Sequence, residues 1–593
     1  MIRRPLRPLA RILRARVTGE DPDKIEAEAR AARMRGKRAA EKRRAENRLW
    51  LLSAVFLAAF VAVGGKMFVL ATTEAVEPVA SVNASPIVNQ RADIVDRHGA
   101  ILATNLITAS LFAHPQDMID RVAAAEGLAQ IFPELNAETL LRQFSGPRKF
   151  VWIRRKMSPE QQQAVYDLGE PGLQFGPREL RLYPNGSFAA HILGGTGFGR
   201  EGVHAAEVIG TAGVELTFDS YLRDPANAGA PLQLSIDMPV QAALEQVLAG
   251  GMMLMNAKAA SAVLMEADTG RIVAMASLPD FDPNHRPLPP VSGDPADSPL
   301  FNRAAQGRYE LGSTFKIFTA AQAMEAGIAN PTTMIDTSGP LVWGRYRIRD
   351  FHNYGAQLSL MDVIVKSSNI GSARLAVSMG AETQQEFLGR LGMLEAIPLE
   401  LPESVRSTPT TPRRWSEIST MTVSYGHGIA ATPVHLASAY ASLINGGLRV
   451  RPSLLLSSPL PNEADRIVSP ETSANVREML RNVVVRGTAS LGDVEGYEVG
   501  GKTGTADKPI PTGGGYYEDR VIATFAGAFP MSDPRYVLVV TLDEPEDTTG
   551  TEPRRTAGWT SVPVAAEIIR RIAPLMGMHP NYAEQAPLVL ASQ

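Results

Sequence analysis

A serine and a lysine one helical turn apart are the first residues in this 593-residue chain whose types and spacing could do chemistry. Ser313 opens a pattern typical of a helix, and Lys316 lies on the same face. A serine needs a base to become a nucleophile, and a desolvated lysine with a lowered pKa can supply one. The unpaired N–H groups at a helix start would favour the negative charge that develops during attack.

Two further polar elements follow in the chain. Ser367 and Asn369 form a Ser-x-Asn pattern, whose hydroxyl could relay a proton and whose amide could hold a substrate amide. The last element offers a positive charge and hydroxyls for a substrate carboxylate: Lys502, Thr503, Gly504 and Thr505. Gly501 and Gly504 would let a peptide backbone approach this strand-like stretch closely.

The ordered trio is more specific than any of its members. Patterns of the Ser-x-x-Lys and Ser-x-Asn type should each occur about once or twice by chance in a chain of this length. Residues 81–83 and 473–475 also fit the second pattern. The Lys-Thr-Gly element is rarer by about an order of magnitude. The same three elements are shared by class A β-lactamases and penicillin-binding proteins.

The residues around the trio resemble class B penicillin-binding proteins over about residues 40–577. In the catalytic part the resemblance rests on residues 303–316, 269–284 and 501–506. Upstream, residues 91–99, 181–186 and 210–215 resemble pedestal motifs of the family and are expected to form turns and buried ion pairs. The chain departs from the family pattern at Leu311, where many members have Pro, and at Ala92, where Gly is usual.

The resemblance implies a peptidoglycan D,D-transpeptidase that cross-links stem peptides ending in D-Ala-D-Ala. Ser313 would attack the penultimate carbonyl with Lys316 as base, and Ser367 would carry the proton to the departing D-alanine. The backbone N–H groups of Ser313 and Thr505 would form the oxyanion hole. β-Lactams would be covalent inhibitors trapped on Ser313.

The remaining site residues are implied to bind the substrate. Asn369 would orient the acyl chain, whereas the Lys502–Thr505 element, Gly504 included, would bind the carboxylate. The resemblance implies no metal and no organic cofactor.

Two segments resemble division-type rather than elongation-type members of class B. They are residues 424–428 (SYGHG), followed by Thr432 and Pro433, and residues 152–172. His427 in the first of them is expected to be structural rather than a general base. An elongation-type transpeptidase is the alternative within the class.

Other functions stay open as alternatives. One is hydrolysis by the same trio, as in a D,D-carboxypeptidase or a β-lactamase, although such enzymes generally lack a long pedestal. A non-enzyme alternative is a β-lactam sensor or a division scaffold. A bifunctional enzyme is disfavoured because the stretch of about 155 residues before the catalytic part leaves little room for a glycosyltransferase domain. A separate membrane glycan polymerase and division-complex proteins are therefore the expected partners.

Charge and hydropathy predict a membrane anchor. Residues 1–48 hold 16 Lys/Arg and 7 Asp/Glu, whereas the rest of the chain holds 43 and 55. An uncharged apolar run begins at Leu49, and with its continuation after Lys66 it matches the ~20 residues that cross a bilayer. The basic side should stay in the cytoplasm, which predicts a single-pass inner (plasma) membrane protein with a periplasmic catalytic part. The basic head is interpreted as a membrane flank, so no nucleic-acid partner is expected.

The chain has no cysteine, which excludes disulfides and a thiol nucleophile.

The pattern of elements predicts an α+β multidomain protein. We expect a basic cytoplasmic tail (1–48), a transmembrane anchor (49–70), a periplasmic α+β pedestal of the dimerisation type (71–227), a transpeptidase domain (228–577) and a C-terminal tail (578–593). The transpeptidase domain should have an antiparallel sheet flanked by helices, as in β-lactamase-like folds. Strands are expected at 93–95, 101–103, 232–236, 262–266, 271–276, 497–500, 521–529 and 536–542. Helices are expected at 117–132, 158–168, 238–248, 313–326, 361–379, 433–445 and 562–576, and a linker at 72–88.

Overall fold

The computed structural model of the chain describes residues 18–19, 21–72, 91–201, 206–227, 230–510 and 514–582. The chain divides into two compact units, Met1–Pro78 and Val79–Gln593. Most of the expected linker at 72–88 lies outside the described residues.

The first unit contains one long helix, α2 (Pro22–Thr72). Its stretch Glu46–Met67 is, among the described residues, the one helical segment long and apolar enough to cross a membrane. None of this stretch is buried, and Leu51, Phe56 and Val61 are all exposed. A helix that is apolar on all sides needs a non-aqueous environment, so the exposed surface fits the anchor expected at residues 49–70.

The second unit begins with the pedestal. Its sheet has the order β3-β2-β1-β7, with β4 also paired to β2. The strands are β1 (Ile94–Val95), β2 (Ile101–Ala113), β3 (Val151–Met157), β4 (Leu173–Leu182) and β7 (Leu232–Gln233). Helices α3 (Arg121–Ile131), α4 (Ala137–Phe144) and α5 (Pro159–Tyr166) accompany them, and Leu111, Leu128 and Phe144 lie in their shared core. The strands expected at 93–95 and 101–103 and the helices expected at 117–132 and 158–168 are confirmed.

A buried ion-pair network closes the pedestal, as the sequence predicts. Glu215, at the start of α7 (Gly213–Thr217), is fully buried and accepts hydrogen bonds from Arg91 Nε at 2.7 Å and Arg181 Nε at 2.6 Å. Arg91 also pairs with Asp219 at 2.7 Å. Each of these groups comes from a different motif or turn, so the network ties the ends of the pedestal together. The neighbouring hairpin is β5 (Gly195–Glu201) and β6 (Ala206–Ala212).

The catalytic part is built on a five-stranded antiparallel sheet with the order β14-β15-β16-β8-β9. The strands are β14 (Gly500–Pro509), β15 (Tyr516–Phe529), β16 (Tyr536–Asp543), β8 (Ala259–Glu266) and β9 (Ile272–Leu278). The expected hairpin and the two last expected strands are confirmed, whereas the strand expected at 497–500 begins only at Gly500. Because β14 is an edge strand, one side of its backbone has no strand partner. That free edge is where the Lys502–Thr505 element lies.

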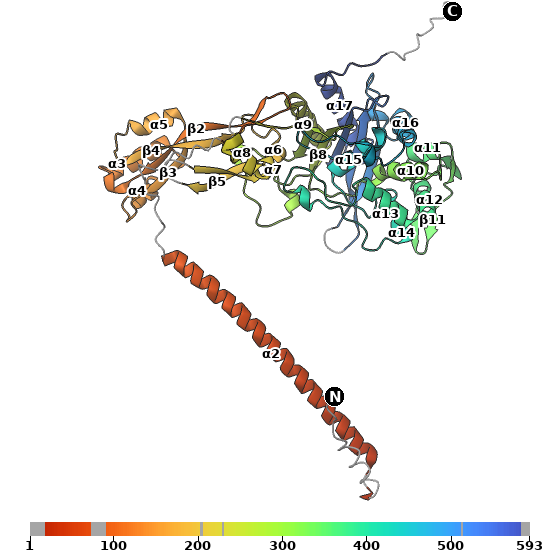
Figure 1. The fold of residues 1–593 in the computed structure, drawn as a ribbon, viewed down its shortest axis with the longest axis horizontal. Coiled ribbons are helices and arrows are strands. Elements are labelled where there is room, and N and C mark those ends of the chain that lie inside the picture. Colours follow the sequence, from red (N-terminus) through yellow and green to blue (C-terminus); the bar gives the residue numbers. More distant parts are fainter. Residues whose placement is uncertain are drawn as a thin grey trace, which may run out of the picture. The chain divides into compact units, whose positions relative to one another are not determined.

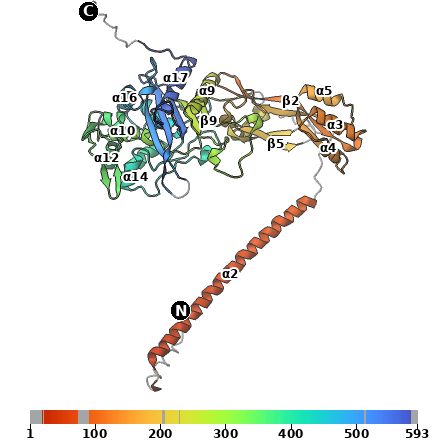
Figure 2. The same cartoon turned by 180° about the vertical axis from the view of Figure 1, so that it is seen from behind.

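Helices flank this sheet, which is blue and olive in Figures 1 and 2. One group consists of α9 (Met238–Leu254) and α17 (Ser561–Leu575), which pack on the sheet and on each other. A second group includes α10 (Lys316–Glu325), α15 (Pro433–Ile444) and α16 (Pro470–Arg486). Shorter elements complete the part: α11 (Leu360–Val365), α12 (Asn369–Met379), α13 (Ala381–Arg390), α14 (Glu417–Val423) and the hairpins β10/β13 (Met334–Asp336, Gln357–Ser359) and β11/β12 (Leu341–Trp343, Tyr346–Ile348).

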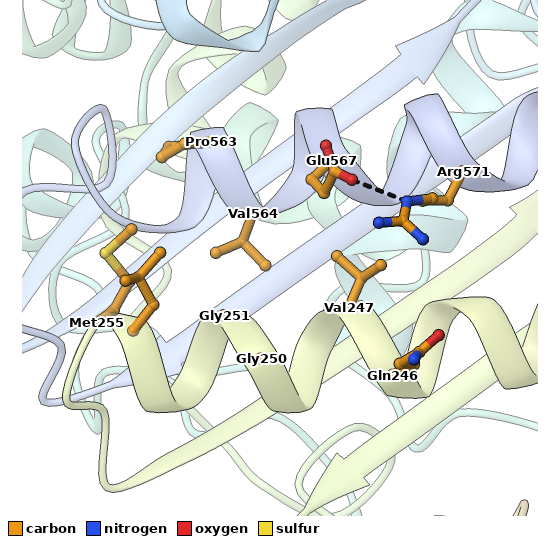
Figure 3. A pocket seen from close by; sticks show the side chains of 10 residues that line it. Gln246, Val247, Gly250, Gly251, Met255, Pro563, Val564, Glu567 and Arg571 are labelled. Atoms are coloured by element: carbon orange, nitrogen blue, oxygen red, sulfur yellow. Dashed lines mark hydrogen bonds and ion pairs between the residues drawn. The ribbon is translucent and has the colours of Figure 1, made fainter.

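The helices α9 and α17 approach each other at a glycine. A Cβ atom on Gly251 would lie 2.7 Å from both methyl groups of Val564. Beside this contact the helices leave a mainly apolar cavity of about 330 Å³, with the Glu567–Arg571 ion pair at one end (Figure 3). The cavity contains none of the predicted site residues.

Hydrogen bonds join the pedestal to the catalytic part within the second unit. Asp96 Oδ2 accepts from the backbone N–H of Met238 at 3.1 Å. Asn284 accepts from the backbone N–H of Tyr183 and donates to its carbonyl, at 3.0 and 2.9 Å. The strand expected at 232–236 is only the two-residue β7, and it pairs with β1 rather than with the catalytic sheet. The domain boundary at 227/228 stays a prediction.

Candidate active site

The nucleophile segment is a tight turn that leads into α10. Gly312–Phe315 form a 3-10 turn, and Lys316 is the first residue of the helix. Gly312 has a φ of +55°, and a Cβ atom there would lie 2.8 Å from the carbonyl oxygen of Thr505. Glycine is therefore required both by the backbone conformation and by the strand behind it. Ser313 remains half-buried at the wall of a cavity of about 750 Å³.

Lys316 lies behind this wall. It is 1% exposed, and its Nζ donates to the carbonyl oxygen of Ser367 at 2.5 Å and to Ser367 Oγ at 3.0 Å. Burial lowers the pKa of Lys316 well below its usual value, and the neighbouring Lys502 lowers it further, whereas Asp350 opposes the shift. The neutral amine that a general base requires is thereby favoured.

Ser367 sits at a break between two helices. The prediction of one helix over residues 361–379 is wrong: α11 ends at Val365, and α12 begins at Asn369. Between them Ser367 has a φ of +62°, a conformation that costs a side-chain residue free energy and recurs at functional sites. The apolar spacing of the sequence continues through the break, which explains why the pattern predicts one continuous helix over residues 361–379.

The break lets the hydroxyl of Ser367 meet both lysines. Lys502 Nζ donates to Ser367 Oγ at 3.0 Å, as Lys316 Nζ does. With two hydrogen bonds accepted, the oxygen keeps only its own proton to offer, so Ser367 is arranged as a donor. Ser367 also lines the cavity that holds Ser313.

Asp350 holds the start of α12 in place. Its carboxylate accepts from the backbone N–H groups of Asn369 and Ile370, at 2.6 and 3.0 Å, and from Ser368 Oγ at 2.7 Å. A carboxylate at a helix N-terminus is a favourable cap. The Asn369 side chain lines the cavity and donates to the Arg349 carbonyl at 2.9 Å, which leaves its oxygen for a ligand.

The Lys502–Thr505 element divides between the interior and the cavity. Thr503 and Thr505 line the cavity, whereas Lys502 is fully buried behind it. Burial lowers the pKa of Lys502 to about 7. Thr503 Oγ1 lies 2.6 Å from Thr488 Oγ1, and Thr505 Oγ1 accepts from the backbone N–H of Ala557 at 3.0 Å.

Gly504 serves the fold of the site rather than its surface. A Cβ atom there would lie 2.1 Å from the carbonyl oxygen of Leu311, two residues before the nucleophile. The backbone that approaches this glycine is thus the chain's own nucleophile segment, not a substrate peptide. On the other side, Gly312 lies against the backbone of Thr505. The free edge of β14 and the nucleophile turn therefore form one packed unit, with backbone N–H groups beside Ser313.

The structure brings together all three elements that the sequence predicts. Ser313, Ser367, Asn369, Thr503 and Thr505 line the same cavity, with Lys316 and Lys502 behind it. Sequence reasoning missed Asp350 and Thr488. It named His427 but missed its pairing with Glu310 at the cavity edge, where the two side chains lie 3.0 Å apart. Asp350 and Thr488 stand in no recognisable motif, and their roles depend on contacts made across the fold. The other cavity residues include Phe351, His352, Tyr354, Tyr425, Asp507, Val521 and Trp559.

Comparisons with known proteins agree with this arrangement. Residues 260–570 match the penicillin binding protein transpeptidase domain family, and residues 86–227 match the penicillin-binding protein dimerisation domain family. The chain is 36% identical over 498 residues to the probable peptidoglycan D,D-transpeptidase FtsI of Caulobacter vibrioides, covering 82% of each chain. It is 27% identical over 537 residues to the peptidoglycan D,D-transpeptidase FtsI of Escherichia coli K12, covering 84% of this chain and 86% of that one.

A solved structure shares the fold of both parts. The crystal structure of penicillin binding protein 3 from Mycobacterium tuberculosis, complexed with ampicillin, aligns with a TM-score of 0.63 and 25% identity. The alignment covers 85% of this chain and 99% of that one. These matches thus agree with the fold and with the site. The fold has a pedestal and an antiparallel sheet flanked by helices, and the site gathers a serine and two lysines at one cavity. The chain belongs to the class B penicillin-binding proteins, and among them it is similar to the FtsI transpeptidases.

Proposed function

We propose that the chain is a serine-type peptidoglycan D,D-transpeptidase that cross-links stem peptides through an acyl-enzyme on Ser313. The observation that carries the proposal is the convergence of two buried lysines on Ser367 Oγ beside Ser313, in a cavity large enough for a peptide end. The printed names of the relatives, D,D-transpeptidases, give the same reaction class.

Acylation uses Lys316 as the base. The neutral amine takes the proton of Ser313, whose Oγ attacks the carbonyl of the penultimate D-alanine. The developing oxyanion is held by the backbone N–H groups of Ser313 and Thr505, where the free edge of β14 meets the nucleophile turn. The C–N bond then breaks, and the departing D-alanine takes a proton from Ser367, which Lys316 replenishes.

The negative charge of the substrate also contributes to its binding. Its terminal carboxylate lies against Thr503 and Thr505, with Lys502 behind them. Because burial lowers the pKa of Lys502 to about 7 in the empty site, an incoming carboxylate favours the protonated form and so forms a charge-assisted contact. Asn369 orients the acyl chain. The amine of a neighbouring stem then takes the acyl group and frees Ser313.

The proposed place of action is the inner membrane at the division septum. The apolar stretch Glu46–Met67 is the proposed anchor. The basic residues before it support a cytoplasmic N-terminus and a periplasmic catalytic part. The septum is proposed because the relatives named above are called FtsI. A membrane glycan polymerase and division-complex proteins are the proposed partners, since the chain must receive nascent strands. β-Lactams are the proposed covalent inhibitors.

Labelling with a fluorescent penicillin tests the proposed nucleophile. The full chain in detergent should form a slowly decaying adduct that peptide mapping assigns to Ser313, and Ser313→Ala should form none. Ser473→Ala is the matched control, because Ser473 belongs to a chance Ser-x-Asn pattern and is buried away from the cavity, bonded to Gly446. This variant should label normally. Rapid turnover of the adduct would indicate a hydrolase instead, and a folded protein without an adduct would indicate a scaffold.

A further inference from the structure

A second polar group lines the Ser313 cavity, on the loop that follows α14. This loop is fixed to the nucleophile segment. A Cβ atom on Gly426 would lie 2.1 Å from the carbonyl oxygen of Gly312. Tyr309 and Ala431 exchange backbone hydrogen bonds at 2.9 and 3.0 Å. A side chain on the loop therefore has a defined position relative to Ser313.

His427 projects from this loop into the cavity, with Glu310 behind it. The His427 side chain is 43% exposed, and that of Glu310 is 12% exposed. Nδ1 of His427 lies 3.0 Å from Oε2 of Glu310, in a geometry that fits an ion pair better than a directed hydrogen bond. The ring also packs on that of Tyr516, with centroids 4.8 Å apart.

Glu310 is itself held in position. Its Oε1 accepts from the backbone N–H of Gly428 at 3.1 Å and from the Tyr516 hydroxyl at 2.9 Å. The carboxylate is thus fixed on one oxygen by two donors and presents the other to His427. The charge of the carboxylate therefore draws Nδ1 of His427 toward Glu310 and leaves the far nitrogen as the one that can act as a base.

His427 differs from the buried His435 in the hydrogen bonding of its far nitrogen, Nε2. Within the described residues, no hydrogen bond reaches Nε2 of His427, whereas the buried His435 has both nitrogens engaged. Its Nδ1 lies 2.7 Å from Thr432 Oγ1, and its Nε2 lies 2.9 Å from the Glu395 carbonyl oxygen. His427 keeps a nitrogen available at the cavity.

The groups around His427 favour a cation. Glu310 faces it from the nucleophile segment, Asp507 from β14, Tyr516 from β15 and Tyr425 from its own loop. Contact with Glu310 and the charge of Asp507 raise the pKa of His427, whereas burial opposes the shift. The pKa of Asp507 is raised by burial and by Glu310, against the charge of His427. Glu310 and Asp507 thus make this part of the wall anionic, whereas the donor's carboxylate is proposed to bind at Lys502.

Transpeptidation requires a proton acceptor that acylation does not. Lys316 and Ser367 return to their starting states once the donor's D-alanine has left with its proton. The acceptor amine then arrives as an ammonium ion, because an alkyl amine of pKa ~10.4 is neutral in fewer than about one molecule in a thousand at pH 7. An ammonium nitrogen has no lone pair with which to attack.

We propose that His427 is the base that deprotonates the acceptor ammonium ion, with Glu310 as a positioning residue and Asp507 as the group that attracts the cation. The inference rests on the proposed transpeptidase function. One proton passes from the ammonium nitrogen to Nε2 and from there to solvent. The neutral amine attacks the acyl carbon, the N–C bond forms, and the C–Oγ bond breaks. The second proton passes from the amine through Lys316 to Ser313 Oγ.

The test separates the two half-reactions in the full-length protein. Acylation is followed with a fluorescent penicillin, which needs no acceptor. Acyl transfer is followed with a stem-peptide thioester and increasing D-alanine, as the ratio of aminolysis to hydrolysis. In His427→Gln this ratio should fall at least tenfold at pH 7 relative to any change in the acylation rate, and the loss should shrink toward about pH 10, where D-alanine itself supplies the neutral amine. Glu310→Gln should lower the ratio less. His285→Gln, which changes a histidine that also lies 3.0 Å from a carboxylate, that of Asp282, but that does not line the cavity, should leave the ratio unchanged.

A change of acceptor distinguishes a base from a merely structural residue. Hydroxylamine is already neutral at pH 7, so the defect of His427→Gln should shrink to less than about threefold with this acceptor. A defect of equal size with D-alanine and hydroxylamine, or equal losses of acylation and aminolysis, would overturn the proposal. An unchanged ratio in His427→Gln would overturn it as well. If the unmodified chain formed no acyl-enzyme at all, the proposed function itself would fail.

Discussion

Lys316 and Lys502 share one acceptor, Ser367 Oγ, and neither lysine has a carboxylate within salt-bridge distance among the described residues. Two ammonium groups so close in a buried site would repel each other, and burial disfavours both charges. The pKa of Lys316 is therefore lowered strongly, and that of Lys502 is lowered to about 7. At the scale of the residue, burial without a carboxylate in salt-bridge contact favours the neutral form of Lys316, which is the form that acts as a base.

This arrangement predicts the pH dependence of acylation. A lysine whose folded-state pKa is lowered loses its proton at a lower pH, so the base form of Lys316 is already present near neutrality. The rate constant for acylation by a fluorescent penicillin should rise with pH and reach its plateau well below pH 10.5, the ordinary pKa of a lysine. Lys316→Arg should abolish it, at least about a thousandfold, since a guanidinium ion does not act as a base. A rate that kept rising tenfold per pH unit to about pH 10 would contradict the lowered pKa.

The reacting side chains could be predicted from the sequence because their types, spacing and order carry the information. Ser313, Lys316 and the Lys502–Thr505 element stand in short motifs whose members are neighbours in the chain. Asp350 and Glu310 could not be assigned roles in this way. Asp350 caps a helix that begins 19 residues later, and Glu310 meets a loop more than 100 residues away. Contacts of this kind arise only from the tertiary packing.

At the scale of the element, backbone proximity decides which glycines can be replaced. Gly250 and Gly251 are adjacent in α9, and both border the cavity between α9 and α17 (Figure 3). A Cβ atom on Gly250 would meet nothing within 4 Å, whereas one on Gly251 would lie 2.7 Å from two atoms of Val564. The helix–helix distance is thus set at Gly251.

The pair predicts opposite changes in stability. Gly250→Ala should raise the free energy of unfolding by about 0.5–1 kcal/mol, because alanine loses less backbone entropy in a helix. Gly251→Ala should lower it by about 1–3 kcal/mol through overpacking against Val564. Urea titration of the two variants beside the parent chain measures both. Equal effects of the two substitutions would mean that α9 and α17 are not in close contact.

Elements were predictable where periodicity and end signals agreed. The sheet strands 521–529 and 536–542 and the helix 433–445 are long, apolar and bounded by turn residues, and they fold as expected. The helix expected at 361–379 fails because the break at Ser367 has no proline or glycine to mark it. The break is held instead by Asp350 and by two lysines from other elements.

At the scale of the whole molecule, the pedestal and the catalytic part belong to one compact unit. Glu215 is the centre of a buried polar network in this unit. This carboxylate is fully buried between Arg91 and Arg181, and the Tyr183 hydroxyl also reaches it, at 3.3 Å. The backbone N–H of Tyr183 in turn donates to the side-chain oxygen of Asn284 in the catalytic part, and the Asn284 side-chain nitrogen donates to the Tyr183 carbonyl. The network therefore links the pedestal motifs to the domain that carries Ser313, although none of its members lines the cavity.

Glu215→Gln should consequently reduce stability without disabling the site. Removing the charge leaves Arg91 with Asp219 alone and takes from the buried Arg181 the carboxylate it pairs with, which costs about 3–5 kcal/mol. Glu567→Gln is the matched control, because Glu567 also lies between two arginines, Arg570 and Arg571, but its side chain is 37% exposed. An exposed pair contributes only about 0–1 kcal/mol, since water and salt screen it.

Denaturant unfolding of the full chain should therefore separate the two variants, whereas fluorescent-penicillin acylation at 25 °C should stay within about twofold of the parent in both. Equal destabilisation by the two substitutions would mean that the buried network does not hold the pedestal together. A selective loss of acylation in folded Glu215→Gln would mean that the pedestal controls the geometry around Ser313.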